Sequence, residues 1–548
     1  MKQKFLLVLF AGIISVNALA QPQLRGQKAI GGNDLDQFSS MDLTKDGGLI
    51  VGGYSFSDKS FQKTENNKGL AGTGDYWVVK LNSNHKIQWD KTIGGNIDDR
   101  LTCVRQTSDG GYILGGFSNS DRSGDKTQES RGDFDYWVVK INKNSGIEWD
   151  RTIGGNDDDE LESVQQTSDG GYILGGFSYS NISGEKTENN RAEGPFKSPD
   201  YWVVKLNGAG EIQWDKTIGG SDEDNLYALQ QTTDGGYILG GLSYSNKSGE
   251  KTENRRGSSV TPDYWVVKLD SHGNIRWDKT IGGDGDDELL SLQQTVDGGY
   301  MLGGISGSDI SAQKTEVNRG GDDYWVVKLD QTGNVQWDKT IGGSDIDVLT
   351  SLQQTRDSGY ILGGWSHSNI SYEKSENTRN YAYDDYWVVK LDKDGSFQWD
   401  KTVGGTNLDR LQSIKEIGKN RYLLGGYSES RISGDRTVRL RGSRDYWLVK
   451  LVYEKTSGPV IAYQNKSEIA TPKNGSNNFT IYPNPAKDIL YIQIKHKATL
   501  SLTDQSGKIL LTKTFDGTGT INVAGVKPGL YYLKNNCTSA MKKIIVNR

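Results

Sequence analysis

Acidic side chains recur along this chain at two positions of a sequence repeat whose period is 60 to 65 residues. The first position is occupied by Asp36, Asp99, Asp159, Asp224, Asp287, Asp347 and Asp409. The second opens seven copies of the tripeptide Asp-Tyr-Trp, at Asp75, Asp135, Asp200, Asp263, Asp323, Asp385 and Asp445. A polar loop between them reads Lys-Thr-Glu-Asn in several repeats, for example at Lys186, Glu188 and Asn189. Carboxylates in such a pattern can bind Ca²⁺ or hold tight turns by accepting backbone N–H groups.

These positions have two interpretations, a ligand site in each repeat or a structural role in each turn. The ligand interpretation assigns calcium or sugar binding to Asp159, Asp200, Lys186, Glu188, Asn189, Asp224, Asp263 and Asp287. Acidic runs at residues 157–160 and 284–288 offer the oxygen ligands that calcium takes, but an Asp-x-Asp-x-Asp-Gly loop is absent from the sequence. Recurrence in every repeat favours the structural role. No cofactor and no metal ligand are therefore predicted, with Ca²⁺ as the alternative.

Catalytic chemistry has little support in the sequence. The four histidines, His85, His272, His367 and His496, are scattered, whereas a Ser/His/Asp centre or a zinc site needs a cluster. We find no single repeat that concentrates polar residues, so no catalytic residue is predicted. A glycosidase needs only two carboxylates, and this chain has many. A polysaccharide-degrading enzyme therefore stays as the alternative to a non-enzymatic binding protein.

Short strands must position these residues, because each repeat contains four strand-like segments and no helical periodicity. In the third repeat the segments are residues 161–167, 172–178, 201–206 and 212–218. An Asp-Gly turn joins the first two segments, and a Gly-containing turn joins the last two. Four antiparallel strands per repeat predict the blade of a β-propeller, whereas the coils of a β-solenoid are shorter and parallel.

The ends of the repeat array predict how the ring closes. Seven Asp-Tyr-Trp segments stand against only six endings of the type Trp-Asp-Lys-Thr-Ile-Gly-Gly. Residues 24–32 align with residues 212–220, so that Lys28 matches Lys216 and Ile30 matches Ile218. We expect this N-terminal strand to complete the last blade, which gives a closed ring of seven blades without exposed sheet edges.

The repeat resembles the bacterial β-propeller repeat family labelled SBBP. The resemblance rests on GGNDDDELESVQQTSDGGYILGGFS at residues 154–178, followed by DYWVVKLNGAGEIQWDKTIGG at residues 200–220, and it covers residues 24–451. It implies the propeller fold and no particular activity, since propellers host many activities.

Residues 1–20 have the pattern of a signal peptide. Lys2 and Lys4 precede an apolar run too short to span a membrane, and cleavage is expected after Ala20. The chain is therefore expected to be exported, with no transmembrane segment. The two cysteines, Cys103 and Cys537, lie in different predicted domains and are not expected to pair. A net charge of −6 argues against nucleic acid as a partner.

The C-terminal part has short alternating strands between Gly and Pro turns, which predict a small Ig-like β-sandwich. Its motifs are, in order, Tyr482, Pro483, Asn484 and Pro485; Gly507; Gly529 and Tyr531; and Lys542 and Lys543. In this order they closely resemble the type A C-terminal sorting domain of the type IX secretion system of Bacteroidetes. The resemblance implies recognition by that secretion machinery and its sortase, followed by release or attachment at the cell surface.

The sequence thus predicts an all-β chain with four parts: a signal peptide at 1–20, a seven-bladed propeller at 21–452, a linker at 453–478 and a sorting domain at 479–548. The leading functional hypothesis is a non-enzymatic binding or scaffold protein at the cell surface, with a glycan or a protein as ligand. Near-identical blades would make such binding multivalent. A structural component of a surface layer is a further alternative.

Overall fold

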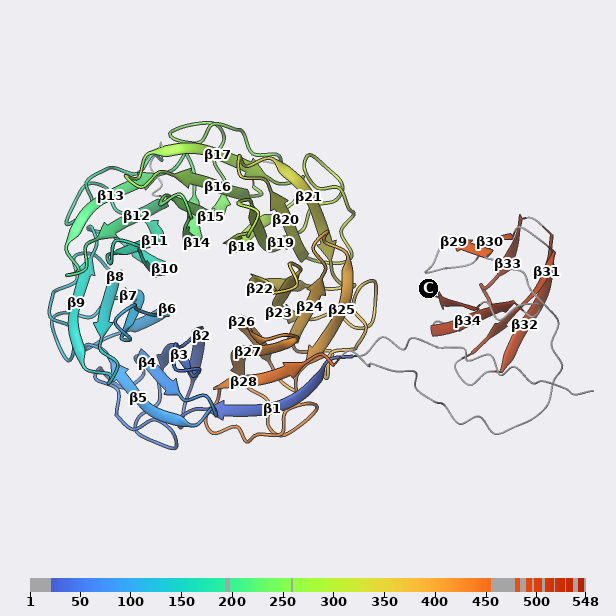
Figure 1. The fold of residues 1–548 in the computed structure, drawn as a ribbon, viewed down its shortest axis with the longest axis horizontal. Helices are drawn as coiled ribbons and strands as arrows, with labels where there is room; N and C mark the ends of the chain where they lie inside the picture. The colour runs from blue at the N-terminus through green and yellow to red at the C-terminus, as the bar shows by residue number, and fades with distance from the viewer. Residues whose placement is uncertain are drawn as a thin grey trace, which may run out of the picture. The chain divides into compact units, whose positions relative to one another are not determined.

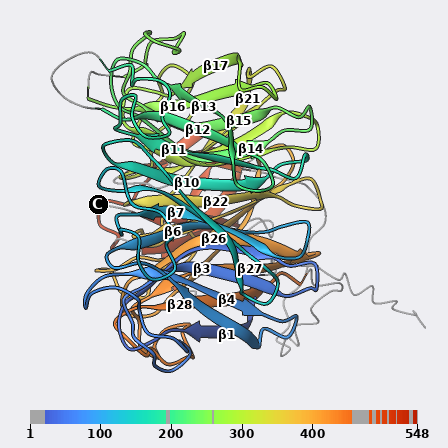
Figure 2. The same ribbon diagram turned by 90° about the vertical axis from the view of Figure 1, so that its left-hand side faces the viewer.

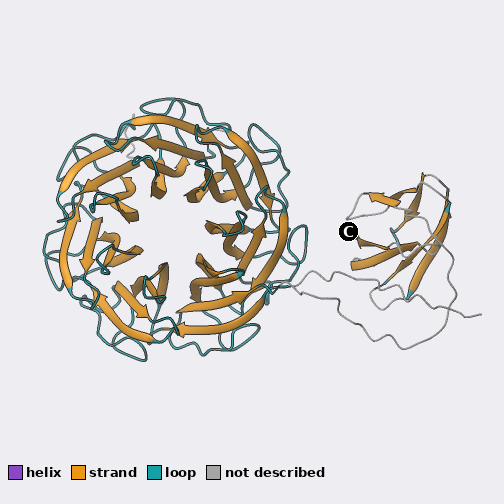
Figure 3. Cartoon of the chain, viewed as in Figure 1, coloured by secondary structure: helices purple, strands orange, loops and turns teal. Residues whose placement is uncertain are grey.

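The computed structural model describes residues 21–192, 198–257, 260–454, 479–482, 489–494, 497–504, 508–516, 518–527, 529–535 and 541–546. Within these ranges every regular element is a β-strand, as predicted (Figure 3). The chain divides into two compact units, Met1–Pro459 and Val460–Arg548, which are described separately. The predicted signal peptide with Ala20, and residues 455–478 of the predicted linker, lie outside the described residues.

Seven four-stranded antiparallel sheets, the blades, form a ring in the first unit (Figures 1 and 2). Blades 1 to 3 consist of β2 (Asp36–Leu43), β3 (Leu49–Ser55), β4 (Asp75–Leu81) and β5 (Ile87–Ile93); β6 (Asp99–Gln106), β7 (Tyr112–Ser118), β8 (Asp135–Ile141) and β9 (Ile147–Ile153); and β10 (Asp159–Gln166), β11 (Tyr172–Ser178), β12 (Asp200–Leu206) and β13 (Ile212–Ile218). Blades 4 to 6 consist of β14 (Asp224–Gln231), β15 (Tyr237–Ser243), β16 (Asp263–Leu269) and β17 (Ile275–Ile281); β18 (Asp287–Gln294), β19 (Tyr300–Ser306), β20 (Asp323–Leu329) and β21 (Val335–Ile341); and β22 (Asp347–Gln354), β23 (Tyr360–Ser366), β24 (Asp385–Leu391) and β25 (Phe397–Val403). The first strand of each blade is the innermost (Figure 1).

Blade 7 is closed by the N-terminal strand, as predicted. It consists of β26 (Asp409–Gly418), β27 (Arg421–Ser428), β28 (Asp445–Val452) and β1 (Gln23–Ile30). Lys28 pairs with Leu448 and Ile30 pairs with Tyr446, which is the register of Lys216 and Ile218 in blade 3. The two chain ends of the propeller are therefore joined by backbone hydrogen bonds, and the ring has no open edge at its seam.

The Asp-Tyr-Trp motif links neighbouring blades. Its tyrosine is fully buried and donates a hydrogen bond to the backbone carbonyl of the tryptophan in the next blade, for example from Tyr201 to Trp265 at 3.0 Å. The bond repeats at all seven interfaces, and the one from Tyr446 to Trp77, also 3.0 Å, crosses the seam. The motif's tryptophan instead bonds within its own blade, from Trp202 Nε1 to Asp215 Oδ2 at 3.1 Å. Buried aromatic residues with satisfied polar ends thus hold the blades in contact.

The innermost strands direct a dense set of side chains into the ring. Each of them shifts register near its centre, between Leu161 and Ser163 in β10 for example, because it carries a β-bulge. As a result the adjacent residues Glu162 and Ser163 both line the central cavity of the ring.

The second unit is a small sandwich of two antiparallel sheets. One sheet has the order β29 (Phe479–Tyr482), β30 (Ile489–Ile494), β33 (Thr518–Asn522), and the other has the order β32 (Ile509–Phe515), β31 (Ala498–Thr503), β34 (Gly529–Asn535), β35 (Met541–Val546). Leu490 and Ile521 of the first sheet share one buried core with Leu500 and Leu533 of the second. The prediction of a small β-sandwich is confirmed.

Candidate functional site

The recurring aspartates of the innermost strands are buried and hold turns. The exposed fraction is 0% for Asp159, Asp224 and Asp287. Asp224 accepts hydrogen bonds from the Gly220 N–H at 2.6 Å and from Ser245 Oγ at 3.0 Å. Asp159 and Asp287 make the equivalent bonds in their own blades. Each carboxylate therefore fixes the loop that enters its blade.

The aspartates of the Asp-Tyr-Trp motif are also buried, beneath the glycine pair of the repeat. Asp200 and Asp263 each accept a backbone N–H, from Arg191 and Arg256, at 2.6 Å. A Cβ added to Gly219 would lie 2.2 Å from the Asp200 Cγ atom. The first glycine of each pair is thus required because the backbone crosses directly over a carboxyl group.

Like charges meet where two blades touch. The carboxyls of Asp200 in blade 3 and Asp224 in blade 4 interact across the interface, and Asp200 Oδ1 has no hydrogen-bond partner among the described residues. Burial raises the pKa of Asp224 to about 6, and burial together with the charge of Asp224 raises the pKa of Asp200 to about 8. Ionisation of both buried carboxyls at neutral pH is costly, and the raised pKa of Asp200 favours its protonated form there.

The Lys-Thr-Glu-Asn loop also makes internal contacts. Lys186 is buried, donates to Thr217 Oγ1 at 2.6 Å and lies 5.3 Å from the centre of the Trp202 ring. Burial lowers its pKa to about 8. Glu188 accepts from Arg191 at 2.7 Å, and the exposed Asn189 accepts the Ile182 N–H at 3.0 Å. Arg191 then reaches Glu250 of the next blade at 3.0 Å. The loop therefore joins neighbouring blades, a role that was not predicted from the sequence.

The eight residues predicted as ligand contacts are thus brought together within and between blades 3 to 5, but their polar atoms mainly face protein atoms. Their ligand role stays a prediction, and so does calcium binding. Among the described residues, no group of three or more His, Cys, Asp or Glu side chains is placed to hold a metal ion.

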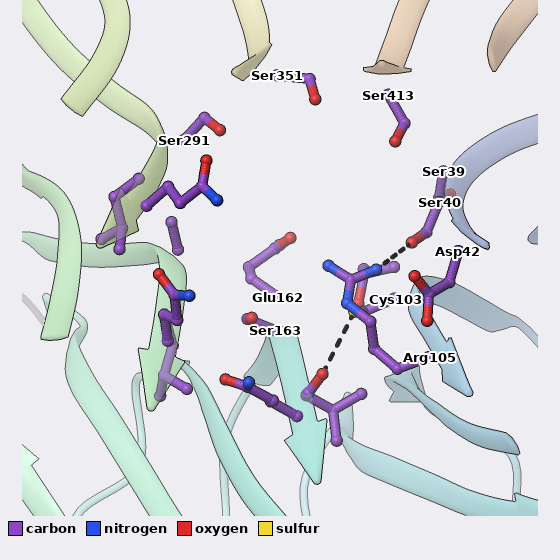
Figure 4. Close-up of a pocket in the computed structure, with 18 of the residues that line it drawn as sticks. Ser39, Ser40, Asp42, Cys103, Arg105, Glu162, Ser163, Ser291, Ser351 and Ser413 are labelled. Atoms are coloured by element: carbon purple, nitrogen blue, oxygen red, sulfur yellow. Dashed lines mark hydrogen bonds between the residues drawn. The ribbon is translucent and has the colours of Figure 1, made fainter. Parts of the chain in front are cut away.

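A central channel offers a polar surface that is open to a ligand. Its cavity has a volume of about 760 Å³ and is lined by the innermost strands of all seven blades (Figure 4). Five blades contribute a serine at one level of the wall, and the other two contribute Cys103 and Ala228: the serines are Ser40, Ser163, Ser291, Ser351 and Ser413. Hydroxyl groups at this level can donate and accept hydrogen bonds.

A belt of side-chain acceptors lies nearer the end of the innermost strands. Gln165, Gln230, Gln293 and Gln353 occupy the same position in blades 3 to 6, and each accepts a backbone N–H from the next blade at 2.7–2.8 Å. Asp42 in blade 1 accepts the Gln106 N–H in the same way, at 3.0 Å. These bonds stitch adjacent blades together around the channel. We call this ring of seven positions the belt.

Charged residues break the belt in one sector. Blades 7, 1 and 2, which are neighbours in the ring, place Lys415, Asp42 and Arg105 at the belt positions. Arg105 Nη1 donates to Ser40 Oγ at 3.1 Å and to the Val104 carbonyl at 3.0 Å (Figure 4). Burial, together with the like charge of Arg105, lowers the pKa of Lys415 to about 8. The channel wall is therefore mainly polar, with interspersed apolar residues such as Leu290, and it is positively charged on one side.

Glu162 is a further ionisable group on the channel wall (Figure 4). Burial, assisted by the charge of Glu160, raises its pKa to about 8. Glu162 is therefore predominantly protonated at neutral pH and can donate a hydrogen bond into the cavity.

These channel residues were missed by sequence reasoning, which looked for features that all repeats share. The signal was available: an alignment of the seven innermost strands shows glutamine at the belt position in four repeats and Asp42, Arg105 and Lys415 in the other three. Residues that differ between the near-identical repeats thus mark the channel, whereas residues that all repeats share mark the fold.

The predicted sorting motifs fall partly within the described strands. Tyr482 ends β29, Gly529 and Tyr531 lie in β34, and Lys542 and Lys543 lie in β35. The Tyr531 hydroxyl donates to the Lys527 carbonyl at 2.7 Å. Pro483, Asn484, Pro485 and Gly507 lie outside the described residues.

Comparison with known proteins assigns the C-terminal unit. Residues 480–547 match the family described as secretion system C-terminal sorting domain. A curated relative, the regulatory protein FlaEY of Caulobacter vibrioides, is 23% identical over 344 residues, which is 58% of this chain and 35% of the relative. The chain thus spans about a third of the length of that relative.

Solved structures give distant similarities to the propeller. The WD40 domain of Pan2 from Neurospora crassa is 10% identical, with a TM-score of 0.41, and the match covers 78% of this chain and 97% of that one. A quinohemoprotein alcohol dehydrogenase from Pseudomonas putida is 10% identical, with a TM-score of 0.36 and coverages of 82% and 79%. Similarities of this extent assign no function.

No helix that could span a membrane occurs in the part of the chain that the structure describes. The repeated blades and the family match agree with the two resemblances seen in the sequence. The chain is a β-propeller repeat protein of seven four-stranded blades that carries a secretion system C-terminal sorting domain.

Proposed function

We propose that this chain is an exported, non-enzymatic binding protein that takes one hydroxyl-rich ligand, a glycan, in the central channel of its propeller. The observation that carries the proposal is the channel itself. Its volume of about 760 Å³ falls in the range of small-ligand sites, and serine hydroxyls and glutamine amides surround it. Such groups match the donors and acceptors of a sugar.

The side-chain contacts favour one ligand per ring over one ligand per blade. The side chains that repeat in every blade are engaged within the protein, as Asp200, Asp224 and Lys186 illustrate. The charges that distinguish one sector from another lie in the channel. Binding in the channel is therefore monovalent, in contrast to the multivalent hypothesis drawn from the repeats.

The place of action follows from the C-terminal unit. The sorting-domain match indicates export by the type IX secretion system. We propose that the propeller acts at the cell surface or in the surrounding medium, after contact with the secretion machinery and its sortase.

A polysaccharide-degrading enzyme is the second candidate, and Glu162 favours it. A carboxyl that keeps its proton at neutral pH has the property of a general acid. Glycoside hydrolysis also needs a second carboxylate about 5–9.5 Å from the first. Asp42 is the other carboxylate on the channel wall, and it is engaged by the Gln106 N–H.

A binding screen tests both candidates. The purified protein is applied to an array of neutral and acidic glycans, and each hit is followed by calorimetry to obtain its stoichiometry. We expect a stoichiometry of one ligand per chain and intact oligosaccharide after prolonged incubation. Seven ligands per chain would contradict the channel, and shortened products that disappear in the Glu162→Gln variant would favour the enzyme.

A further inference from the structure

Two belt positions carry a cation where four other blades carry glutamine. In blades 3 to 6 the belt glutamine accepts a backbone N–H of the next blade. Arg105 and Lys415 have no side-chain acceptor atom, so the equivalent N–H groups of Gln166 and Leu43 cannot donate such a bond to them. Sequences depart from the locally best residue mainly at functional sites. Two of the seven belt positions therefore lack the bond to the next blade, although Arg105 keeps a bond to Ser40 of the preceding blade. A ligand that binds the two cations would compensate for the missing bonds.

The hydrogen-bond donors of these cations are available. Among the described residues, the Lys415 ammonium makes no hydrogen bond or ion pair, although it borders the cavity. Arg105 uses only its Nη1 group, for Ser40 and Val104, so its Nε and Nη2 groups still have donors to offer. The side chains of Arg105 and Lys415 are both partly exposed, so a molecule in the channel can reach them.

The charge of this sector is not balanced by protein groups. Asp42 is the carboxylate between the two cations, and its Oδ2 atom already accepts the Gln106 N–H. Two cations beside one carboxylate leave one positive charge. Arg105 and Lys415 also repel each other, which an anion between them would relieve. A group with a single negative charge complements this sector.

We propose that Arg105 and Lys415 bind the carboxylate of an acidic sugar, so that the ligand of the channel is a uronic-acid-containing oligosaccharide. Guanidinium groups bind carboxylates through parallel N–H donors, and the ammonium adds a further charge-assisted bond. The serine level, including Ser40 and Ser413, then faces the sugar hydroxyls. This inference rests on the proposed function, because it names the class of glycan that the channel takes.

The belt supplies conservative variants for the test. Arg105→Gln and Lys415→Gln each install the residue that four other blades carry at this position, so both variants are expected to fold. Lys247→Gln removes an exposed charge outside the channel and serves as the control for net charge. Calorimetry compares two probes of equal length, trigalacturonate and the neutral trisaccharide galactotriose.

We expect trigalacturonate to bind at least about ten-fold more tightly than galactotriose. Arg105→Gln and Lys415→Gln are each expected to lower the affinity for trigalacturonate about ten-fold or more, without changing the affinity for galactotriose. Lys247→Gln is expected to change neither. Equal binding of the two probes, unaffected by Arg105→Gln, would overturn this inference and leave the proposed function intact. Binding of neither probe would overturn this inference, whereas the proposed function is decided by the glycan array.

Discussion

At the scale of single residues, the carboxyl pairs between blades dominate the electrostatics of the ring. The pair of Asp200 and Asp224 recurs at every interface, with a buried lysine or Arg436 nearby. Burial raises the pKa of these carboxyls to about 6 to 8 in blades 1 to 6, above the ordinary value for aspartate. The folded ring therefore holds protons that the unfolded chain releases.

We predict that stability falls as the pH rises from 5 to 7. A carboxyl whose pKa is raised in the folded state contributes most below the unfolded pKa, and the contribution is lost as the pH passes the folded pKa. Asp169, whose pKa is lowered to about 2, acts only at lower pH. Buried lysines such as Lys186, whose pKa is lowered to about 8, have the opposite effect, but mainly above this window. The free energy of unfolding from urea titrations at pH 5, 6 and 7 measures the trend, and an increase with pH would contradict it.

A single substitution isolates one pair. In Asp200→Asn the amide oxygen can still accept the Arg191 N–H, while the amide nitrogen can donate to Asp224. We predict that the stability of the variant relative to the unmodified protein increases as the pH rises from 5 to 8, because a buried amide has no charge to desolvate and no proton to take up on folding. Asp224→Asn should follow the same trend. Destabilisation of equal size at pH 5 and at pH 8 would count against a protonated Asp200 in the folded protein.

At the scale of elements, the innermost strand of each blade has two tasks, to stitch blades together and to shape the channel. Gln293 performs the first task through the Gln354 N–H at 2.8 Å. Arg105 cannot accept the equivalent N–H of the next blade; it donates to Ser40 of the preceding blade and presents charge to the cavity. The same strand position therefore serves stability in four blades and, by our proposal, ligand binding in two.

We predict that Lys415→Gln raises the free energy of unfolding by about 0.5–1.5 kcal/mol, the contribution of one recovered hydrogen bond. The gain arises because glutamine can accept the Leu43 N–H, as Gln165 accepts the Gln231 N–H. Arg105→Gln is expected to gain less, because it also loses the bonds of Arg105 to Ser40 and Val104. Chemical denaturation at neutral pH provides the measurement, and Gln293→Ala serves as the opposite control, with a loss of similar size. A destabilised Lys415→Gln variant would show that lysine is itself the structural choice at this position.

The closing strand β1 yields a prediction at the same scale. Removal of Gln23–Ile30 exposes the hydrogen-bonding edge of β28 and uncovers core residues of blade 7 such as Tyr446. Because Ile30 is itself fully buried, we expect the truncated propeller to lose cooperative unfolding and to aggregate. Thermal denaturation and size-exclusion chromatography measure the effect, and an unchanged transition in the truncated protein would contradict ring closure.

The strands and the ring closure could be predicted from the sequence, because each strand and turn has a strong local signal. The Asp-Gly turns, the alternation in the strands and the unmatched end of blade 7 predict the strands and the closure at Lys28 and Ile30. It was not sufficient for the channel, because the burial of Asp200 and the exposure of Arg105 depend on how blades pack. Asp200 and Arg105 are both charged residues in repeated strands. Only the packing of the assembled ring shows that Asp200 holds a turn and that Arg105 borders the channel.

At the scale of the whole molecule, a nearly sevenfold ring has one charged sector. Seven interfaces with the same tyrosine bond, such as that of Tyr201, make the ring regular. The channel wall departs from this regularity, because its charged belt residues, Asp42, Arg105 and Lys415, all lie in three neighbouring blades. The sorting domain indicates that the protein is exported. By our proposal, the charged sector of the channel then binds one ligand outside the cell.

The most direct test of this account is a crystal structure of the protein soaked with trigalacturonate. The account predicts one oligosaccharide in the central channel, with a carboxylate within hydrogen-bonding distance of Arg105 and Lys415. An oligosaccharide bound instead at the Lys-Thr-Glu-Asn loops, around Glu188 and its equivalents, with no sugar in the channel, would contradict it.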